Sequence, residues 1–303
     1  MRSVVSLFIL MSLANFAQAK APENPCKKLP NNTTIKVGCS DDCDSMDPVL
    51  QEASDKLGIS YELMQLTKPE DLDKVDAYLS PGGPDPDPKY YTKNVTEPSK
   101  LDLIKKLHAK LGNDGQKKPE FDKRDALDSG LLKRYLASDR YANLPFLGVC
   151  YGMQMLAATE GIPLVVDIKS QLKIENRLDK MDQIILLPGS TIAKIANVSG
   201  FSGAENHHQA VDMEYWNENS SAHPTVKITA TSNKGKIPEV IELTNRPAMG
   251  LQYHAEETAN DSAQAPFSWL LENACIRKAN PNGMTSSEVS APATETSAHP
   301  EEE

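Results

Sequence analysis

Short apolar segments alternate with polar stretches through the first half of the chain. Three short apolar runs are bounded by turn residues, which predicts strands over residues 34–38, 75–79 and 144–149. Apolar residues at helical spacing predict helices over 47–57, 101–111, 123–136 and 151–159. Residues 89–121 are polar and Lys-rich, and we expect them to form a lid or an insertion.

The second half of the chain is richer in strand patterns. Short apolar runs predict strands over residues 184–187, 226–231, 240–244 and 249–253. Strands that first alternate with helices and then follow one another indicate an α/β sheet with an antiparallel extension. We expect an N-terminal loop over 20–33, one domain over 34–278, and a disordered tail over 279–303, where large apolar residues are scarce.

Residues 1–19 have the pattern of a cleavable signal peptide. Arg2 precedes a mainly apolar stretch, 4–16, which ends in Ala17-Gln-Ala19. This stretch is shorter than the ~20 residues that span a bilayer, so a retained membrane anchor is the less favoured alternative. The pattern predicts a secreted or periplasmic protein that has no membrane association once the signal is cleaved.

Net charge and cysteine content indicate which class of partner is disfavoured and which cysteines could form disulfides. The formal net charge is -10 and there is no long basic run, which argues against a nucleic-acid partner. The chain has five cysteines, an odd number, and Cys150 is the natural one to remain a thiol. The others, Cys26, Cys39, Cys43 and Cys275, allow three pairings, and four reduced core cysteines are the alternative.

Cys150 lies between a predicted strand and a predicted helix, in Gly148-Val-Cys-Tyr-Gly152. Glycines on either side allow a sharp turn that projects the side chain at the edge of the sheet. The N-terminus of the following helix stabilises a thiolate, and the N–H of Tyr151 is free to donate to an oxyanion. The pattern predicts a nucleophile, with a buried structural cysteine as the alternative.

A thiol nucleophile needs a base, and the base needs an orienting acid. His254 follows an apolar run and is followed two residues later by Glu256. If this segment continues as a strand, the two side chains share a face and can pair. In α/β-hydrolases the acid precedes the histidine along the chain, so the order His254, Glu256 favours a different fold.

The segments around Cys150 and Tyr253-His-Ala-Glu256 together resemble the class I glutamine amidotransferase superfamily. Leu79-Ser-Pro-Gly-Gly-Pro-Asp85 is similar to its oxyanion loop, and residues 187–190 and 205–211 are similar to its stand-alone γ-glutamyl hydrolase and γ-glutamyl-γ-aminobutyrate hydrolase branch. The resemblance implies a doubly wound, mostly parallel, flavodoxin-like α/β sheet with the nucleophile at an elbow. One departure is Tyr253-His-Ala-Glu where the family usually has Trp-His-Pro-Glu.

The resemblance also implies roles for individual residues. Cys150 would attack a γ-carbonyl and form a thioester, with His254 moving the proton and Glu256 orienting His254. The N–H groups of Gly83 and Tyr151 would hold the oxyanion. The implied substrate-binding residues are Gln154, Asn206, His207, His208 and Gln209. No cofactor is implied, and the expected partner is a small γ-glutamyl substrate.

Several alternatives compete with a γ-glutamyl hydrolase. One is a binding or interaction protein with a glutaminase fold, and another is the glutaminase subunit of a two-protein amidotransferase. Because no synthetase domain follows, we expect hydrolysis rather than amide transfer. We do not expect a metal at His207-His208, which lack a third ligand at a recognisable spacing, or calcium at the acidic residues 41–47. The Gly82-Gly83 pair lacks the Gly-Lys-Ser/Thr of a phosphate loop.

Overall fold

The computed structural model describes residues 24–111, 119–175 and 180–280. The predicted signal peptide and nearly all of the predicted tail lie outside these ranges. No helix in the described ranges is long and apolar enough to cross a bilayer.

A nine-stranded sheet in the order β2-β1-β3-β4-β11-β10-β9-β6-β7 forms the centre of the described structure. Neighbouring strands from β2 to β11 pair in parallel, and those from β11 to β7 pair antiparallel, as expected for an α/β sheet with an antiparallel extension. The strands are β1 (Thr34–Cys39), β2 (Ser60–Gln65), β3 (Ala77–Ser80), β4 (Phe146–Val149), β6 (Lys180–Leu186), β7 (Gly200–Glu205), β9 (Val226–Ser232), β10 (Ile237–Leu243) and β11 (Ala248–Leu251). A separate pair is formed by β5 (Leu164–Val165) and β8 (Ala210–Val211).

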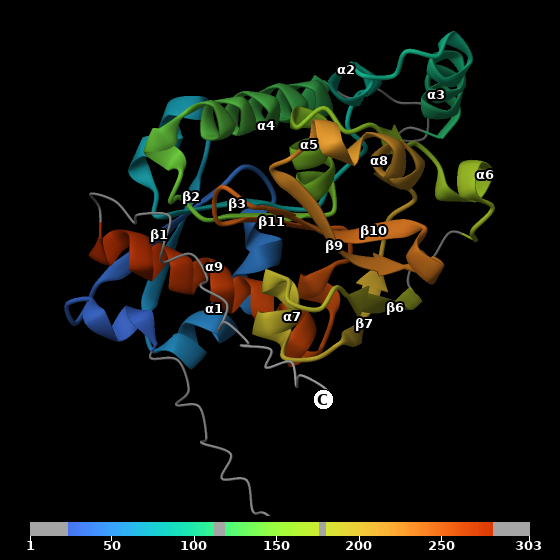
Figure 1. The fold of residues 1–303 in the computed structure, drawn as a ribbon. Coiled ribbons are helices and arrows are strands. Elements are labelled where there is room, and N and C mark those ends of the chain that lie inside the picture. Colours follow the sequence, from blue (N-terminus) through green and yellow to red (C-terminus); the bar gives the residue numbers. More distant parts are fainter. Residues whose placement is uncertain (1–23, 112–118, 176–179, 281–303) are drawn as a thin grey trace, which may run out of the picture.

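Helices cover both faces of the sheet (Figure 1). One face carries α1 (Cys43–Leu57), α7 (Thr191–Ala196) and α9 (Asp261–Ala279), and the other carries α2 (Pro88–Tyr91), α4 (Pro119–Ala137), α5 (Tyr151–Thr159) and α8 (Met213–Asn219). Two separate apolar clusters fill the two faces, so the sheet is buried from both sides. The remaining helices, α3 (Pro98–Leu111) and α6 (Ile168–Leu172), lie at the side of the molecule.

The sequence pattern did not predict β2, β7 or α9. Both strands are at the two edges of the sheet and alternate only weakly between exposed and buried residues. Helix α9 contains Pro266 and buries residues on several sides, including Phe267, Trp269 and Leu270, so no single apolar stripe marks it.

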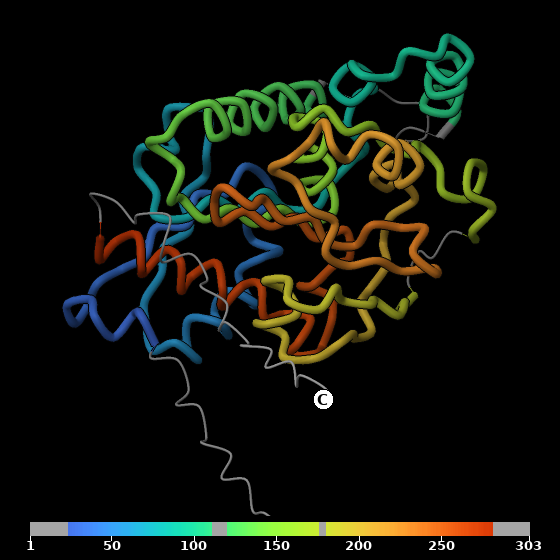
Figure 2. The backbone as a smooth tube through the Cα atoms, viewed as in Figure 1, coloured from blue at the N-terminus to red at the C-terminus, as the bar shows by residue number. Residues whose placement is uncertain are grey.

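Two disulfides join segments near the ends of the described domain. Cys26 bonds to Cys275 of α9, and Figure 2 shows the N-terminal segment beside that C-terminal helix. Cys39 bonds to Cys43 and closes the turn between β1 and α1. All five cysteines lie within the described residues, and Cys150 alone is a free thiol.

The parallel part of the sheet brings the predicted site together. Strands β3, β4 and β11 are adjacent and parallel, so their carboxyl ends meet at the same edge. The loop with Gly82 and Gly83 follows β3, Cys150 follows β4, and His254 follows β11. Residues about 70 and 100 positions apart therefore meet at one point, the usual location of a ligand site in such sheets.

Candidate active site

Cys150 occupies a sharp elbow between β4 and α5. Its backbone angles, φ 47° and ψ -99°, belong to a region that residues other than glycine rarely adopt. The turn is possible because its neighbours lack side chains: a Cβ on Gly152 would lie 2.1 Å from the carbonyl oxygen of Ser80, and one on Gly148 would lie 2.6 Å from the carbonyl carbon of Gly152. The elbow predicted from the two glycines is therefore present, with a strained conformation at the thiol.

His254 and Glu256 are paired beside this thiol. Nδ1 of His254 lies 2.8 Å from Oε1 of Glu256, and both side chains are about 10% exposed. The expectation that a strand holds the pair is wrong, because β11 ends at Leu251 and Glu256 lies in a short 3-10 turn, Ala255–Glu257. That turn brings the carboxylate of Glu256 within hydrogen-bond distance of the imidazole.

The histidine presents its other nitrogen to the thiol. Nε2 of His254 is buried and has no oxygen or nitrogen partner among the described residues, and the side chain interacts with Cys150. Burial alone would lower the pKa of His254, but hydrogen bonds to Cys150 and Glu256, together with their charges, raise it from 6.5 to about 11. The imidazole is thus held in its cationic form at neutral pH.

Gly82 and Gly83 lie between the site and Arg124. A Cβ on Gly82 would lie 3.0 Å from Cε1 of His254 and 3.8 Å from Cβ of Cys150, whereas one on Gly83 would lie 1.9 Å from Nη1 of Arg124. Gly82 thus lies beside His254 and Cys150, and Gly83 lies against the guanidinium of Arg124. Neither position has room for a side chain unless its neighbours move.

The guanidinium of Arg124 fixes how this loop is oriented. Nη2 donates to the carbonyl of Pro81 and Nη1 to the carbonyl of Gly82, both at 2.8 Å. In a trans peptide the N–H points opposite to the carbonyl, so the N–H of Gly83 points away from Arg124. This orientation suits the predicted oxyanion donor.

Tyr151, the other predicted donor, begins α5 and packs beneath Arg124. Its ring centroid lies 4.1 Å from Cζ of Arg124, and its hydroxyl donates to Asp125 at 2.8 Å. The first N–H groups of a helix have no partner within the helix, so the N–H of Tyr151 is available.

Gln252 is a site residue that the sequence pattern did not predict. Its Nε2 lies 3.6 Å from Sγ of Cys150, and its Oε1 accepts a hydrogen bond from Nε2 of Gln154 at 3.3 Å. Gln154, the predicted glutamyl contact, is buried and is joined to the thiol through this second amide. The only sequence signal for Gln252 is its position two residues before His254.

The predicted substrate loop, residues 206–209, alternates between half-buried and buried residues. Asn206 donates to Glu257, and Nε2 of His208 lies 3.0 Å from Asp85 in the loop after β3. Burial lowers the pKa of His208, but the hydrogen bond and charge of Asp85 outweigh it, and the net shift is upward. Asn206 and His208 therefore face the loops around the site.

His207 and Gln209 point into the interior instead. Nδ1 of His207 lies 2.8 Å from the carbonyl of Gln209, and its Nε2 lies 2.7 Å from Oε2 of Glu205. The side-chain amide of Gln209 is buried and has no hydrogen-bond partner among the described residues. The two adjacent histidines of the sequence thus have different environments.

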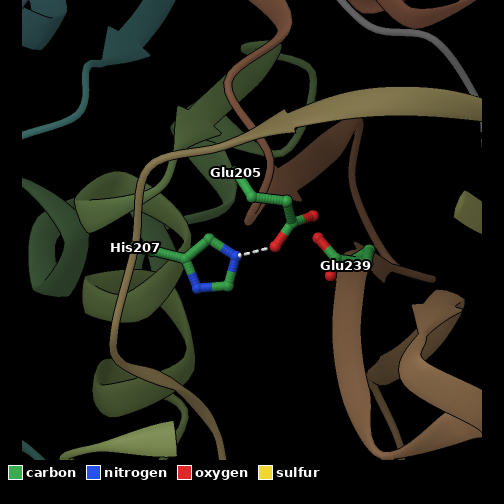
Figure 3. A group of neighbouring side chains, drawn as sticks. All are labelled: Glu205, His207 and Glu239. Carbon is green, nitrogen blue, oxygen red and sulfur yellow. Dashed lines mark hydrogen bonds and ion pairs between the residues drawn. The ribbon is translucent and has the colours of Figure 1, made fainter. Parts of the chain in front are cut away.

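His207, Glu205 and Glu239 form a buried cluster with ligand atoms within 4.8 Å of one another (Figure 3). A cation would fit these atom types, and tertiary structure supplies the two ligands that sequence spacing did not show. Burial, then the charge of Glu205, raises the pKa of Glu239 well above its usual value, which favours its protonated form. Oε1 of Glu205 and Oε2 of Glu239 have no hydrogen-bond partner among the described residues. Ser232 donates to Glu239 at 2.6 Å.

The predicted insertion borders a separate hollow. A cavity of about 770 Å³ lies between α3, α6 and α8, and Lys100, Leu103 and Tyr215 are among its lining residues. None of the predicted catalytic or substrate-binding residues lines it. The role of residues 89–121 as a lid or an insertion stays a prediction.

Comparison with known proteins identifies the family of this domain. The family described as Glutamine amidotransferase class-I matches residues 123–273, a range that includes Cys150, His254 and Glu256. The chain carries a class I glutamine amidotransferase domain. Solved structures support the same fold: a putative GMP synthase component from Thermoplasma acidophilum has a TM-score of 0.53 at 17% identity and covers 81% of this chain and 97% of its own. The Trypanosoma brucei CTPS glutaminase domain with bound acivicin has a TM-score of 0.52 at 15% identity, covering 84% and 96%.

Curated relatives of this glutamine amidotransferase domain include CTP synthases. That of Parvibaculum lavamentivorans is 28% identical over 149 residues, covering 39% of this chain and 27% of the relative, and that of Roseobacter denitrificans is 28% identical over 155 residues, covering 39% and 28%. The chain thus spans little more than a quarter of their length. The matches confirm the predicted fold class and a class I glutamine amidotransferase domain, and the γ-glutamyl hydrolase branch stays a prediction.

Proposed function

We propose that the protein is an exported cysteine hydrolase that cleaves γ-glutamyl amide or peptide bonds. The observation that carries this proposal is the free thiol of Cys150 in a strained elbow, next to an imidazole that Glu256 orients. A thiol, a base and an orienting acid in this arrangement are the requirements for acyl transfer through a covalent intermediate.

The geometry supports a two-step reaction. The thiolate of Cys150 attacks the γ-carbonyl carbon, and the oxyanion that forms accepts hydrogen bonds from the N–H groups of Tyr151 and Gly83. The C–N bond then breaks as the His254 imidazolium gives its proton to the leaving nitrogen, which leaves a thioester. In the second step His254, now neutral, takes a proton from water, and the resulting hydroxide attacks the thioester carbon. The C–S bond breaks, which regenerates the thiolate of Cys150 and releases a γ-carboxylic acid that loses its proton to solvent.

The disulfides support export. Disulfides persist in secreted and periplasmic proteins and are rare in the cytosol, and four of the five cysteines are paired. An exported enzyme would meet γ-glutamyl peptides rather than the ATP-dependent reactions that consume ammonia in the cytosol. The γ-glutamyl class itself rests on the resemblance of residues 187–190 and 205–211 to the stand-alone branch.

A second candidate is the glutaminase part of an ammonia-using synthetase. It is favoured by the relatives, which are CTP synthases, and by the structural likeness to a putative GMP synthase component. In that case L-glutamine would be the preferred substrate, and a synthetase subunit would copurify with the chain and stimulate its hydrolysis.

The two candidates are separated by an assay of released glutamate with L-glutamine, glutathione, a folyl polyglutamate and an α-glutamyl dipeptide as the matched control substrate. We expect cleavage of γ-linked compounds beyond glutamine, no cleavage of the α-linked control, and no activity in Cys150→Ala. Activity on glutamine alone would favour the glutaminase subunit, and activity that survives in Cys150→Ala would exclude the mechanism.

Export is tested by counting thiols in protein taken from its native source. Alkylation in denaturant without a reductant should label one cysteine of the five, and prior reduction should raise the count to five. Five labelled cysteines without reduction would contradict an oxidising compartment.

A further inference from the structure

The oxyanion loop is held by a chain of contacts that begins at a disulfide. Arg124 donates to the carbonyls of Pro81 and Gly82 and thereby directs the N–H of Gly83. Its side chain is only 6% exposed, so the orientation of this guanidinium depends on the groups that surround it. What holds Arg124 therefore also holds the oxyanion donor.

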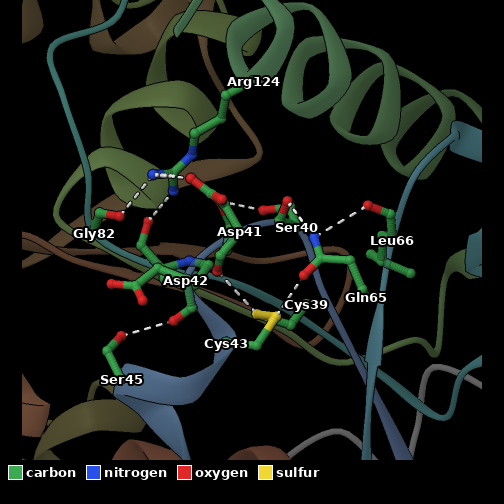
Figure 4. Close-up of a disulfide and its surroundings, with 12 residues drawn as sticks. Cys39, Ser40, Asp41, Asp42, Cys43, Ser45, Gln65, Leu66, Gly82 and Arg124 are labelled. Carbon is green, nitrogen blue, oxygen red and sulfur yellow. Dashed lines mark hydrogen bonds and ion pairs between the residues drawn. A yellow bond between two sulfur atoms is a disulfide. The ribbon is translucent and has the colours of Figure 1, made fainter. Parts of the chain in front are cut away.

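Asp41 and Asp128 hold the guanidinium from two sides. Oδ2 of Asp41 lies 3.0 Å from Nη1 of Arg124, the same nitrogen that contacts Gly82, and Asp128 lies 3.4 Å from Nε. Figure 4 shows Asp41 and Gly82 both joined to Arg124. Asp128 belongs to α4, the same helix as Arg124, whereas Asp41 comes from a different part of the fold and fixes the helix to the loop.

Asp41 is the central residue of the five-residue loop that the Cys39–Cys43 disulfide closes (Figure 4). The next residue, Asp42, has φ 38° and ψ 45°, a left-handed conformation that costs a non-glycine residue free energy. A closed ring of this size restricts the alternatives that the loop could otherwise adopt. Without the disulfide, the loop can relax at Asp42 and carry the Asp41 carboxylate away from Arg124.

The two disulfides differ in how a reductant can reach them. Cys26 and Cys275 are both buried, whereas Cys43 is half-buried at the surface end of its bond to Cys39. A dithiol reductant attacks at an accessible sulfur. Two electrons and two protons pass to the Cys39–Cys43 bond, which becomes two thiols, and the reagent becomes a disulfide. Mild reduction should therefore open this bond before the other.

We propose that Asp41 and the Cys39–Cys43 disulfide are positioning elements of the oxyanion site, acting through Arg124, so that opening this disulfide lowers turnover. The proposal rests on the proposed hydrolase function for its kinetic part. The contacts in question run from the Cys39–Cys43 disulfide through Asp41 and Arg124 to Gly82, and none of them involves Cys150 or His254. We therefore expect opening the disulfide to leave the thiol–imidazole pair unchanged.

The experiment compares Asp41→Asn and the double variant Cys39→Ala/Cys43→Ala with Cys26→Ala/Cys275→Ala, which removes the other disulfide as a matched control. We expect the first two to lower kcat on the preferred γ-glutamyl substrate several-fold, short of the ~10²–10³-fold cost of losing an oxyanion donor. The rate at which iodoacetamide alkylates Cys150 should not change, because it reports the thiolate and not the oxyanion site. The control should keep the wild-type kcat below its melting temperature.

A second measurement does not depend on turnover or on the variants folding. Hydrogen–deuterium exchange of peptides covering residues 77–88 is compared before and after mild reduction of the wild-type protein by a dithiol. Faster exchange there, with unchanged exchange in α9, would support the proposal even if no γ-glutamyl compound is cleaved. Unchanged exchange in this segment, unchanged kcat in Asp41→Asn, or a matching fall in the alkylation rate would each overturn it.

Discussion

Removing the charge of Glu256 should move the alkaline limit of the enzyme without removing its activity at neutral pH. Glu256→Gln keeps an oxygen near Nδ1 of His254 but removes the negative charge that lies 2.8 Å away. An opposite charge at this range raises a histidine pKa by about 1–3 units, which corresponds to about 1.4–4 kcal/mol. The wild-type pKa of His254 is about 11, so the variant should retain an imidazolium at pH 7 and lose it earlier on the alkaline side.

The free energy of unfolding should also depend on the ionisation of His254. Because folding raises the pKa of His254 from 6.5 to about 11, its contribution is complete below about pH 6.5 and is lost as the pH rises towards 11. Glu256→Gln removes part of that contribution, so the melting temperature of the variant should lie below that of the wild type at pH 6. The two should approach each other as the pH rises.

The assay is kcat/KM against pH from about 5 to 11, whose alkaline limb reports the acid form of the free enzyme. Cys150 is the free thiol, so the pH dependence of alkylation gives a second reading without a substrate. Glu257→Gln is the matched control, because its carboxylate lies 3.9 Å from Nδ1 and is 47% exposed, where solvent screens the charge. The reasoning would be refuted if kcat/KM fell at the same alkaline pH in wild type and in Glu256→Gln. It would also be refuted if Glu257→Gln moved this fall by as much as Glu256→Gln does.

Three further results are expected. His254→Ala should lower kcat nearly as much as Cys150→Ala, because a nucleophile and its base act as a unit; substantial residual turnover in a stopped assay would contradict this. Gly83→Ala should lower kcat ~10²–10³-fold by displacing Arg124, with little change in alkylation of Cys150, and near-normal kcat would exclude Gly83 as a donor. Loss of the Cys26–Cys275 disulfide, whose cysteines are 249 residues apart, should lower the free energy of unfolding by about 5 kcal/mol, because a long closed loop restricts the unfolded chain most. Loss of Cys39–Cys43 should lower it by about 2 kcal/mol. Denaturant titrations that give the reverse order would refute this chain-entropy reasoning.

Local patterns predicted the parts of the site that depend on neighbours in the chain. The strand, Gly148, Cys150, Gly152 and the following helix are contiguous, and their steric requirements are the same in any fold that continues a strand into a helix. The pairing of His254 with Glu256 was also predicted, although a turn rather than a strand achieves it. Two side chains that are two residues apart can meet on one face of a strand or across a tight turn, so the spacing predicted the pair but not the backbone conformation.

Contacts between residues far apart in the sequence position the groups that surround Cys150 and His254. The approach of Arg124 to Gly82 joins residues 42 positions apart, and no periodicity in either segment reports it. Gln252 reaches Cys150 only because β4 and β11 pair in parallel. The helix α9 has apolar residues on several sides and was missed, since amphipathic spacing identifies only helices with one buried face.

The sequence by itself determined the elbow at Cys150, the pairing of His254 with Glu256 and the odd thiol, because each depends on residue type and short spacing. The tertiary structure alone decided which cysteines pair, that His207 lies buried against Glu205 while His208 faces Asp85, and that Arg124 orients the loop at Gly82. The physical reason is that hydrogen bonds and disulfides act over a few ångströms. Only the folded sheet brings residues tens to hundreds of positions apart within that range.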